Sequence, residues 1–152
     1  MLQASRDEER SYFEIADIIR AHCAEPNKDL QQLWRRMLFN LLITNVDDHL
    51  QNHGFLHVGK GQWRLAPAFD INPFPDKDRE SKTWLSEQDG PIVDVDMLMA
   101  RCAYFALTPA QAQTVLADVV EAVAGWKTVA LSQDVGLGAN ALDDFAAAFN
   151  SP

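Results

Sequence analysis

The fold of this chain depends on Asn45-Val46-Asp47-Asp48-His49-Leu50-Gln51-Asn52, a polar octet that directly follows an apolar run. Residues 33–43 read Leu-Trp-Arg-Arg-Met-Leu-Phe-Asn-Leu-Leu-Ile, which places apolar side chains at helical spacing over a stretch too long for a strand. We therefore predict a helix that buries Leu33, Met37 and Leu41 and ends where the octet begins.

Two short apolar runs follow the octet, at residues 55–58 and 63–65, with Gly59-Lys60-Gly61 between them. This pattern is typical of two strands joined by a glycine turn. The second run continues into Leu65-Ala66-Pro67-Ala68-Phe69-Asp70. A hairpin here would return the chain toward the octet, so that residues from both motifs line one pocket.

Three of these residues have the kinds of side chain that phosphoryl transfer requires: Asp47, Asn52 and Asp70. Phosphoryl transfer needs a carboxylate that accepts the proton of the attacking hydroxyl, together with oxygen ligands that hold magnesium against the nucleotide phosphates. In protein kinases the catalytic aspartate precedes a metal-binding asparagine by five residues, which is the spacing of Asp47 and Asn52. Asp70 stands where the second metal ligand belongs, although the tripeptide Asp-Phe-Gly is absent.

The sequence resembles the C-terminal lobe of the HipA-like serine/threonine kinases, the toxins of bacterial toxin–antitoxin pairs. The resemblance depends on Asn-x-Asp-x-His-x-x-Asn at 45–52, on Leu-Ala-Pro-Ala-Phe-Asp at 65–70, and on a helical tail that contains Trp126. It extends through most of the chain from about Ser11. It implies a protein-kinase-like C-terminal lobe that is mainly α with a small β-hairpin.

The resemblance also implies roles for individual residues. Asp47 would be the catalytic base, Asn52 and Asp70 would bind Mg²⁺, and Asn45 and His49 would support the catalytic loop. ATP would be the phosphoryl donor, and a serine or threonine of a protein substrate would be the acceptor.

Three further residues are candidates for contact with phosphate or substrate. Many family members carry lysine at the position of Gln51, so the neutral side chain here puts a phosphate contact from that position in question. Arg79 and Lys82 belong to the proline-punctuated charged stretch that follows Asp70 and is predicted to be a loop. The alternative is that both side chains are solvent-exposed residues of a surface loop and contact no ligand.

Composition sets limits on the class of protein. A chain of 152 residues with 47% hydrophobic content fits one domain, which we place at 1–152. The net charge of −9 argues against a nucleic-acid-binding surface. Cys23 and Cys102 both fall in helical apolar patterns and suggest free thiols. There is no signal peptide pattern and no apolar run of about 20 residues, so we expect a cytoplasmic protein without a membrane span.

Helix signals organise the rest of the chain. Ser5 and Glu8 have the form of a capping box for a first helix that ends before Pro26, and Asn27 or Asp29 is a candidate cap for the second. Further along we expect a short strand at 83–86, helical structure from Asp94, a helix that starts at Thr108-Pro109, and a last helix over 140–149.

A kinase also needs a glycine-rich loop and a lysine that contact the nucleotide, both from an N-terminal lobe. The 46 residues before Asp47 contain no glycine and have helical patterns. We therefore expect the chain to lack this N-terminal lobe. The missing lobe would be a partner that the chain needs. Without it, the polypeptide alone should have no appreciable kinase activity.

Two other functions compete with this interpretation. The lobe could be a non-catalytic binding module, directed at an antitoxin or a partner lobe, with an exposed apolar patch and a tendency to form homodimers. Asp47, Asp48 and Asp70 with nearby histidines could instead form a metal-dependent hydrolase site. His49, His53 and His57 recur every four residues, as in a zinc-binding helix, but Gly54 interrupts them.

Overall fold

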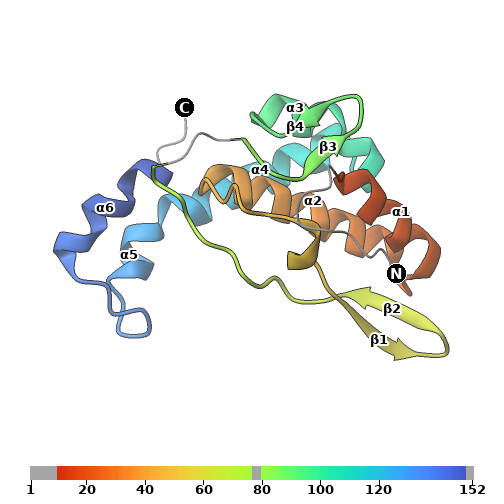
Figure 1. The fold of residues 1–152 in the computed structure, drawn as a ribbon, viewed down its shortest axis with the longest axis horizontal. Helices are drawn as coiled ribbons and strands as arrows, with labels where there is room; N and C mark the ends of the chain where they lie inside the picture. The colour runs from red at the N-terminus through yellow and green to blue at the C-terminus, as the bar shows by residue number, and fades with distance from the viewer. Residues whose placement is uncertain (1–9, 77–79, 150–152) are drawn as a thin grey trace.

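The computed structural model describes residues 10–76 and 80–149 and is mainly helical, with two small antiparallel sheets (Figure 1). The other elements pack around a long central helix, and a β-hairpin projects from one side of it (Figure 1). The elements are, in order, α1 (Tyr12–His22), α2 (Pro26–Leu42), η1 (Leu50–Asn52), β1 (Phe55–Gly59), β2 (Gln62–Leu65), β3 (Trp84–Ser86), β4 (Gly90–Pro91), α3 (Val95–Ala100), η2 (Cys102–Phe105), α4 (Pro109–Ala124), α5 (Trp126–Ala130), η3 (Ala139–Ala141), α6 (Leu142–Ala146) and η4 (Ala147–Phe149).

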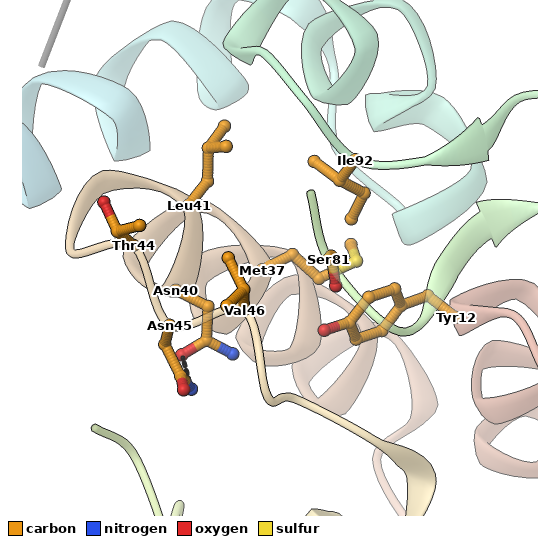
Figure 2. Close-up of a pocket in the computed structure, with 9 residues that line it drawn as sticks. All are labelled: Tyr12, Met37, Asn40, Leu41, Thr44, Asn45, Val46, Ser81 and Ile92. Carbon is orange, nitrogen blue, oxygen red and sulfur yellow. Dashed lines mark hydrogen bonds between the residues drawn. The ribbon is translucent and has the colours of Figure 1, made fainter. Parts of the chain in front are cut away.

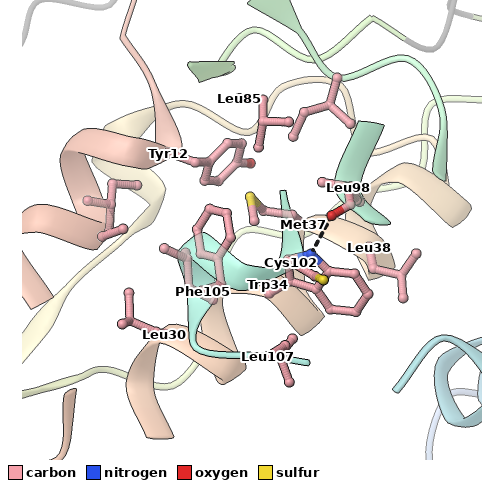
Figure 3. Close-up of a cluster of buried hydrophobic side chains, with 14 of the residues drawn as sticks. Tyr12, Leu30, Trp34, Met37, Leu38, Leu85, Leu98, Cys102, Phe105 and Leu107 are labelled. Atoms are coloured by element: carbon pink, nitrogen blue, oxygen red, sulfur yellow. Dashed lines mark hydrogen bonds between the residues drawn. The ribbon is translucent and has the colours of Figure 1, made fainter. Parts of the chain in front are cut away.

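The central helix α2 forms because its apolar residues recur at helical spacing, and it packs against α1, α3, α4, η2 and β2. Leu33 and Met37 are buried as predicted, whereas Leu41 is only partly buried. Trp34 has no exposed surface, and its indole Nε1 donates to the Leu98 carbonyl oxygen at 3.0 Å (Figure 3). This hydrogen bond satisfies the polar atom of the largest side chain in the core.

The predicted hairpin is confirmed. Strands β1 and β2 pair antiparallel with Phe55 opposite Leu65, and the turn between them uses positive φ angles at Gly59, Lys60 and Gly61. A two-residue turn of this kind needs such angles, which glycine adopts without steric cost.

The base of the hairpin is fixed to α2. The Asp29 carboxylate accepts the backbone N–H of Leu65 at 3.1 Å, and the Arg36 guanidinium donates to the Ala66 carbonyl oxygen. Asp29 and Arg36 are both buried, so these polar groups sit where water cannot replace their partners. The hairpin therefore has a defined position relative to the central helix.

The helix caps agree with the sequence in part. Thr108 caps α4 as predicted, because its Oγ1 accepts the Gln111 N–H at 3.2 Å while the Gln111 side chain accepts the Thr108 N–H at 2.9 Å. The prediction for α2 was wrong: the helix begins at Pro26 after Glu25, and Asp29 faces the hairpin. Helix α1 begins after Ser11, and the predicted capping box at residues 5–8 lies outside the described residues.

The structure contains a second sheet that the sequence analysis did not predict. The strand expected at 83–86 exists as β3, and it pairs antiparallel with β4, with Trp84 opposite Pro91. The Trp84 N–H also donates to the Arg10 carbonyl oxygen at 2.8 Å, which joins this sheet to the start of α1. The last predicted helix, over 140–149, is divided into η3, α6 and η4.

One core holds these elements together (Figure 3). Cys23 and Cys102 are free thiols buried in it, as predicted. Within 10–76 and 80–149, no helix is long and apolar enough to cross a membrane. The core residues without exposed surface come from α1, α2, α3, η2, α4, β3 and the last turn, namely Ala16, Ile19, Leu33, Trp34, Leu38, Leu85, Leu98, Phe105, Ala112 and Ala148.

A matched pair of leucines tests this core. Leu38→Ala should lower the free energy of unfolding by about 2–5 kcal/mol, because it removes a fully buried side chain and leaves a cavity. Leu131→Ala, at a side chain that is 50% exposed, should change it by no more than about 0.5 kcal/mol. Urea denaturation followed by circular dichroism measures both, and equal losses would contradict the packing described here.

Candidate functional site

The polar octet begins where α2 ends, and a strained turn sets its direction. Thr44 has a left-handed backbone with φ of 57°, which is uncommon for a β-branched residue. Its carbonyl oxygen accepts the Phe74 N–H at 3.2 Å, and its Oγ1 donates to the Ala148 carbonyl oxygen at 2.8 Å. The turn is thus held by segments far apart in the sequence.

Asn45 fixes the first residue of the octet to the helix that precedes it. Its N–H donates to the Asn40 carbonyl oxygen at 2.8 Å, and its Nδ2 donates to the Asn40 Oδ1 at 3.1 Å (Figure 2). These two residues help to line a cavity of about 10 Å³, which is barely enough for one water molecule. The octet therefore lies on a tightly packed base.

Asp47 and Asn52 are joined directly within the octet. The Asn52 Nδ2 donates to the Asp47 carbonyl oxygen at 3.1 Å, which closes the loop between them. Asn52 is 7% exposed, whereas the Asp47 side chain is 41% exposed and forms an ion pair with Lys82. Because the amide nitrogen of Asn52 is used within the loop, its Oδ1 is the atom that could bind a cation.

Asp70 follows a residue that lies beside Gly54, just after the octet. The Ala66 N–H donates to the Gly54 carbonyl oxygen at 2.8 Å, and a Cβ added at Gly54 would lie 3.5 Å from the Phe69 ring. Asp70 is exposed, has a left-handed backbone with φ of 55°, and accepts the Asn72 Nδ2 at 3.1 Å. The hairpin thus returns the chain to Gly54, two residues after the octet, with Asp70 one residue beyond the contact; a pocket shared by Asp47, Asn52 and Asp70 stays a prediction.

Asp48, next to Asp47, is the residue whose importance the sequence analysis missed. It is 3% exposed, its Oδ2 accepts the Asn40 Nδ2 at 2.8 Å, and the Tyr12 hydroxyl donates to the same oxygen. His53 Nε2 lies 3.1 Å from Asp48 Oδ1. The available signal was Asn40, a polar residue in an otherwise apolar stretch of helix.

The surroundings of Asp48 act on its pKa in opposite directions. Burial by itself raises the pKa of this carboxyl, but the interactions with His53, Tyr12 and Asn40 outweigh it and hold the pKa below the usual value. For Tyr12, burial and the charge of Asp48 both raise the pKa well above the usual value. The pair is therefore an ionised carboxylate and a neutral phenol at neutral pH.

The remaining predicted site residues occupy different surroundings. His49 is partly buried, and its Nδ1 has no hydrogen-bond partner among the described residues, so its supporting role stays a prediction. Gln51 is exposed in η1. Lys82 contacts Asp47, as described above, and Arg79 lies outside the described residues.

The histidines do not form a shared metal site in this arrangement. His53 is paired with Asp48, whereas His57 lies on β1 with its ring 5.1 Å from the Trp63 ring. Across 10–76 and 80–149, no three His, Cys, Asp or Glu side chains are grouped so that they could hold one metal ion. Asn52 and Asp70 offer amide and carboxylate oxygens, which suit Mg²⁺ because this ion keeps several waters and needs few protein ligands.

A larger cavity opens beside the octet, between α1 and the hairpin. Its volume is about 620 Å³, and its wall is mainly apolar. His53 and Gly54, which directly follow Asn52, contribute to it. The full lining is Ile15, Ile18, His22, Leu50, His53, Gly54, Phe55 and Trp63.

The buried carboxylate gives a pH-dependent prediction. Asp48→Asn should lower the free energy of unfolding by about 1–3 kcal/mol at neutral pH, because it leaves buried donors poorly matched. The pKa of Asp48 is lowered in the folded state. Its stabilising effect is therefore complete above the pKa of an unfolded aspartate, about 3.9, and is lost as the pH falls through the folded-state pKa.

The difference between wild type and Asp48→Asn should accordingly shrink between neutral pH and about pH 3, measured by urea denaturation at each pH. Asp118→Asn is the matched control, because Asp118 is 56% exposed and lies 3.7 Å from Arg35 in a surface ion pair. Its effect should stay within about 0.5 kcal/mol at both pH values. A difference for Asp48→Asn that does not depend on pH would contradict the ionised state of this carboxyl.

Comparison with known proteins identifies the family of the chain. A Haemophilus influenzae protein named "Putative kinase" is 29% identical to the chain over 76 residues. The match covers 48% of this chain and 22% of that protein, so the chain spans about a fifth of the length of this relative. The family model described as HipA-like C-terminal domain matches residues 1–126. The chain therefore belongs to the HipA-like C-terminal domain family.

Proposed function

We propose that this chain is the C-terminal catalytic lobe of a HipA-like serine/threonine kinase that transfers the terminal phosphoryl group of ATP to a protein hydroxyl. The observation that carries the proposal is the closed loop from Asp47 to Asn52, with the hairpin β1–β2 directly after it and Asp70 beyond the hairpin. This order and spacing suit the parts that phosphoryl transfer requires.

Asp47 suits the role of catalytic base. Its side chain is 41% exposed and precedes the buried Asp48. The Asp47 carboxylate would orient the substrate hydroxyl and accept its proton while the hydroxyl oxygen forms a bond to the terminal phosphorus. The bond from that phosphorus to the bridging oxygen breaks at the same time, and ADP leaves with the electron pair.

Asn52 and Asp70 suit the role of magnesium ligands. The amide nitrogen of Asn52 is already bonded to the Asp47 carbonyl, which leaves the amide oxygen for a cation, and Asp70 presents an exposed carboxylate. When bound, Mg²⁺ would neutralise phosphate charge as it develops. The 620 Å³ apolar cavity is lined by Leu50 and His53, on either side of Asn52, and it is large enough to accommodate the base of the nucleotide.

Under this proposal, the complete enzyme also requires parts outside this lobe. An N-terminal lobe would cover the nucleotide, and an antitoxin would be the regulatory partner. Without such a lobe we expect weak nucleotide binding and no appreciable turnover, because phosphoryl transfer depends on the position of the nucleotide.

One observation favours a second function, that of a non-catalytic binding module. Leu56 and Val58 are 41% and 49% exposed on the same face of β1, and Phe69 is 47% exposed in the segment after the hairpin. Apolar side chains presented in this way are suited to a partner lobe or an antitoxin. The two functions differ in whether the chain itself binds magnesium and nucleotide.

Binding of nucleotide to the 152-residue chain tests the proposal. NMR titration with ADP in the presence of Mg²⁺ should shift the amide signals of residues 47–54 and 69–72, and removal of Mg²⁺ with EDTA should weaken binding at least tenfold. Asp70→Asn should also weaken Mg²⁺-dependent binding about tenfold or more, because it removes the charge of a metal ligand.

Asp134→Asn is the matched control for this experiment, since Asp134 is exposed in a turn between α5 and η3. It should bind ADP as the wild type does. If the wild type shows no Mg²⁺-dependent shift at millimolar ADP, the catalytic proposal fails and the binding module becomes the better account.

A further inference from the structure

The segment that follows the proline-rich stretch runs directly along the octet. The Lys82 N–H donates to the Val46 carbonyl oxygen at 3.1 Å, and the Thr83 Oγ1 donates to the Asp48 carbonyl oxygen at 2.5 Å. These two bonds fall on either side of Asp47. They place the backbone of residue 82 beside the proposed catalytic base.

The side chain of Lys82 completes this contact. Its Nζ donates to Asp47 Oδ1 and forms an ion pair across 35 positions of sequence. The Lys82 side chain is 56% exposed and that of Asp47 is 41% exposed, so the pair is accessible from solvent. A ligand that approaches the base would therefore meet the ammonium group as well.

The negative charge of the octet explains why an ammonium group would be useful at this position. The octet contains Asp47 and Asp48 but no lysine or arginine, so by itself it would repel the phosphates of a nucleotide. Asp48 is ionised and buried, which adds a fixed negative charge beneath the site. A cation supplied from outside the octet would offset this repulsion.

We propose that Lys82 is a positioning residue that holds the Asp47 carboxylate and binds the terminal phosphate of ATP. This inference rests on the proposed function. An ammonium group has three donors, so Nζ can keep its bond to Asp47 while it donates to a phosphate oxygen. It would thereby fix the distance between the base and the phosphoryl group that the substrate hydroxyl attacks.

The preference for ATP over ADP tests this role, because only ATP carries the terminal phosphate. In the 152-residue chain with Mg²⁺, Lys82→Ala should weaken ATP binding about tenfold, the loss of one charge-assisted hydrogen bond, while ADP binding changes less than about twofold. Lys82→Arg keeps the charge and should retain most of the preference. In wild-type protein, the NMR signal of the Lys82 ammonium group should shift with ATP and not with ADP.

Lys60→Ala is the matched control, because Lys60 is exposed in the turn of the hairpin and should affect neither nucleotide. Amide spectra of each variant without nucleotide establish that it is folded. If Lys82→Ala weakens the binding of ATP and ADP equally, or makes ATP bind more tightly, the inference is overturned and the proposed function stays intact. Absence of Mg²⁺-dependent binding of either nucleotide to the wild type would overturn both.

Discussion

The charge of Asp48 is held inside the protein, and this constraint governs the arrangement around the site. A residue that is 3% exposed can keep an ionised carboxylate only if donors from the protein replace water. Tyr12 from α1 and Asn40 from α2 supply them, His53 Nε2 lies 3.1 Å from the carboxylate, and the Thr83 hydroxyl donates to the backbone carbonyl of the same residue. Helices α1 and α2 must therefore both be in place before this carboxylate is satisfied. The adjacent Asp47 gains a fixed direction from that requirement, since its neighbour cannot turn outward without leaving several donors unpaired.

Much of the local structure followed from the sequence because it depends on short-range rules. The central helix, the hairpin with its glycine turn and the cap at Thr108 each have a signal within a few residues. The spacing of Asp47 and Asn52 also predicted a loop, which the structure closes with one hydrogen bond. Asp29 shows the limit of such rules. It resembles a helix cap in sequence, yet it faces the hairpin and accepts the Leu65 N–H, a partner 36 positions away.

The parts that could not be predicted are those made by distant segments. Nothing local distinguishes Asp48 from Asp47, and only the packing of α1 and residue 83 shows which of the two is buried. The pairing of β3 with β4 was missed because β4 has two residues and includes Pro91, so it carries no strand pattern. The contact between Lys82 and Asp47 likewise depends on the route of the chain after Asp70. In each case the sequence contains the partner residue, but it does not show where that residue lies in the folded protein.

The hydrogen bond from Thr44 to the Ala148 carbonyl oxygen links the first turn of the site to the last described turn of the chain. A short turn such as η4 usually opens more easily than a core helix, through local fluctuations that leave the rest of the protein folded. Here such an opening would release the hydroxyl of a residue whose left-handed backbone directs the octet. Local opening of η4 would thus reach the turn that precedes the octet, and amide hydrogen exchange at residue 45 would report whether the two open together.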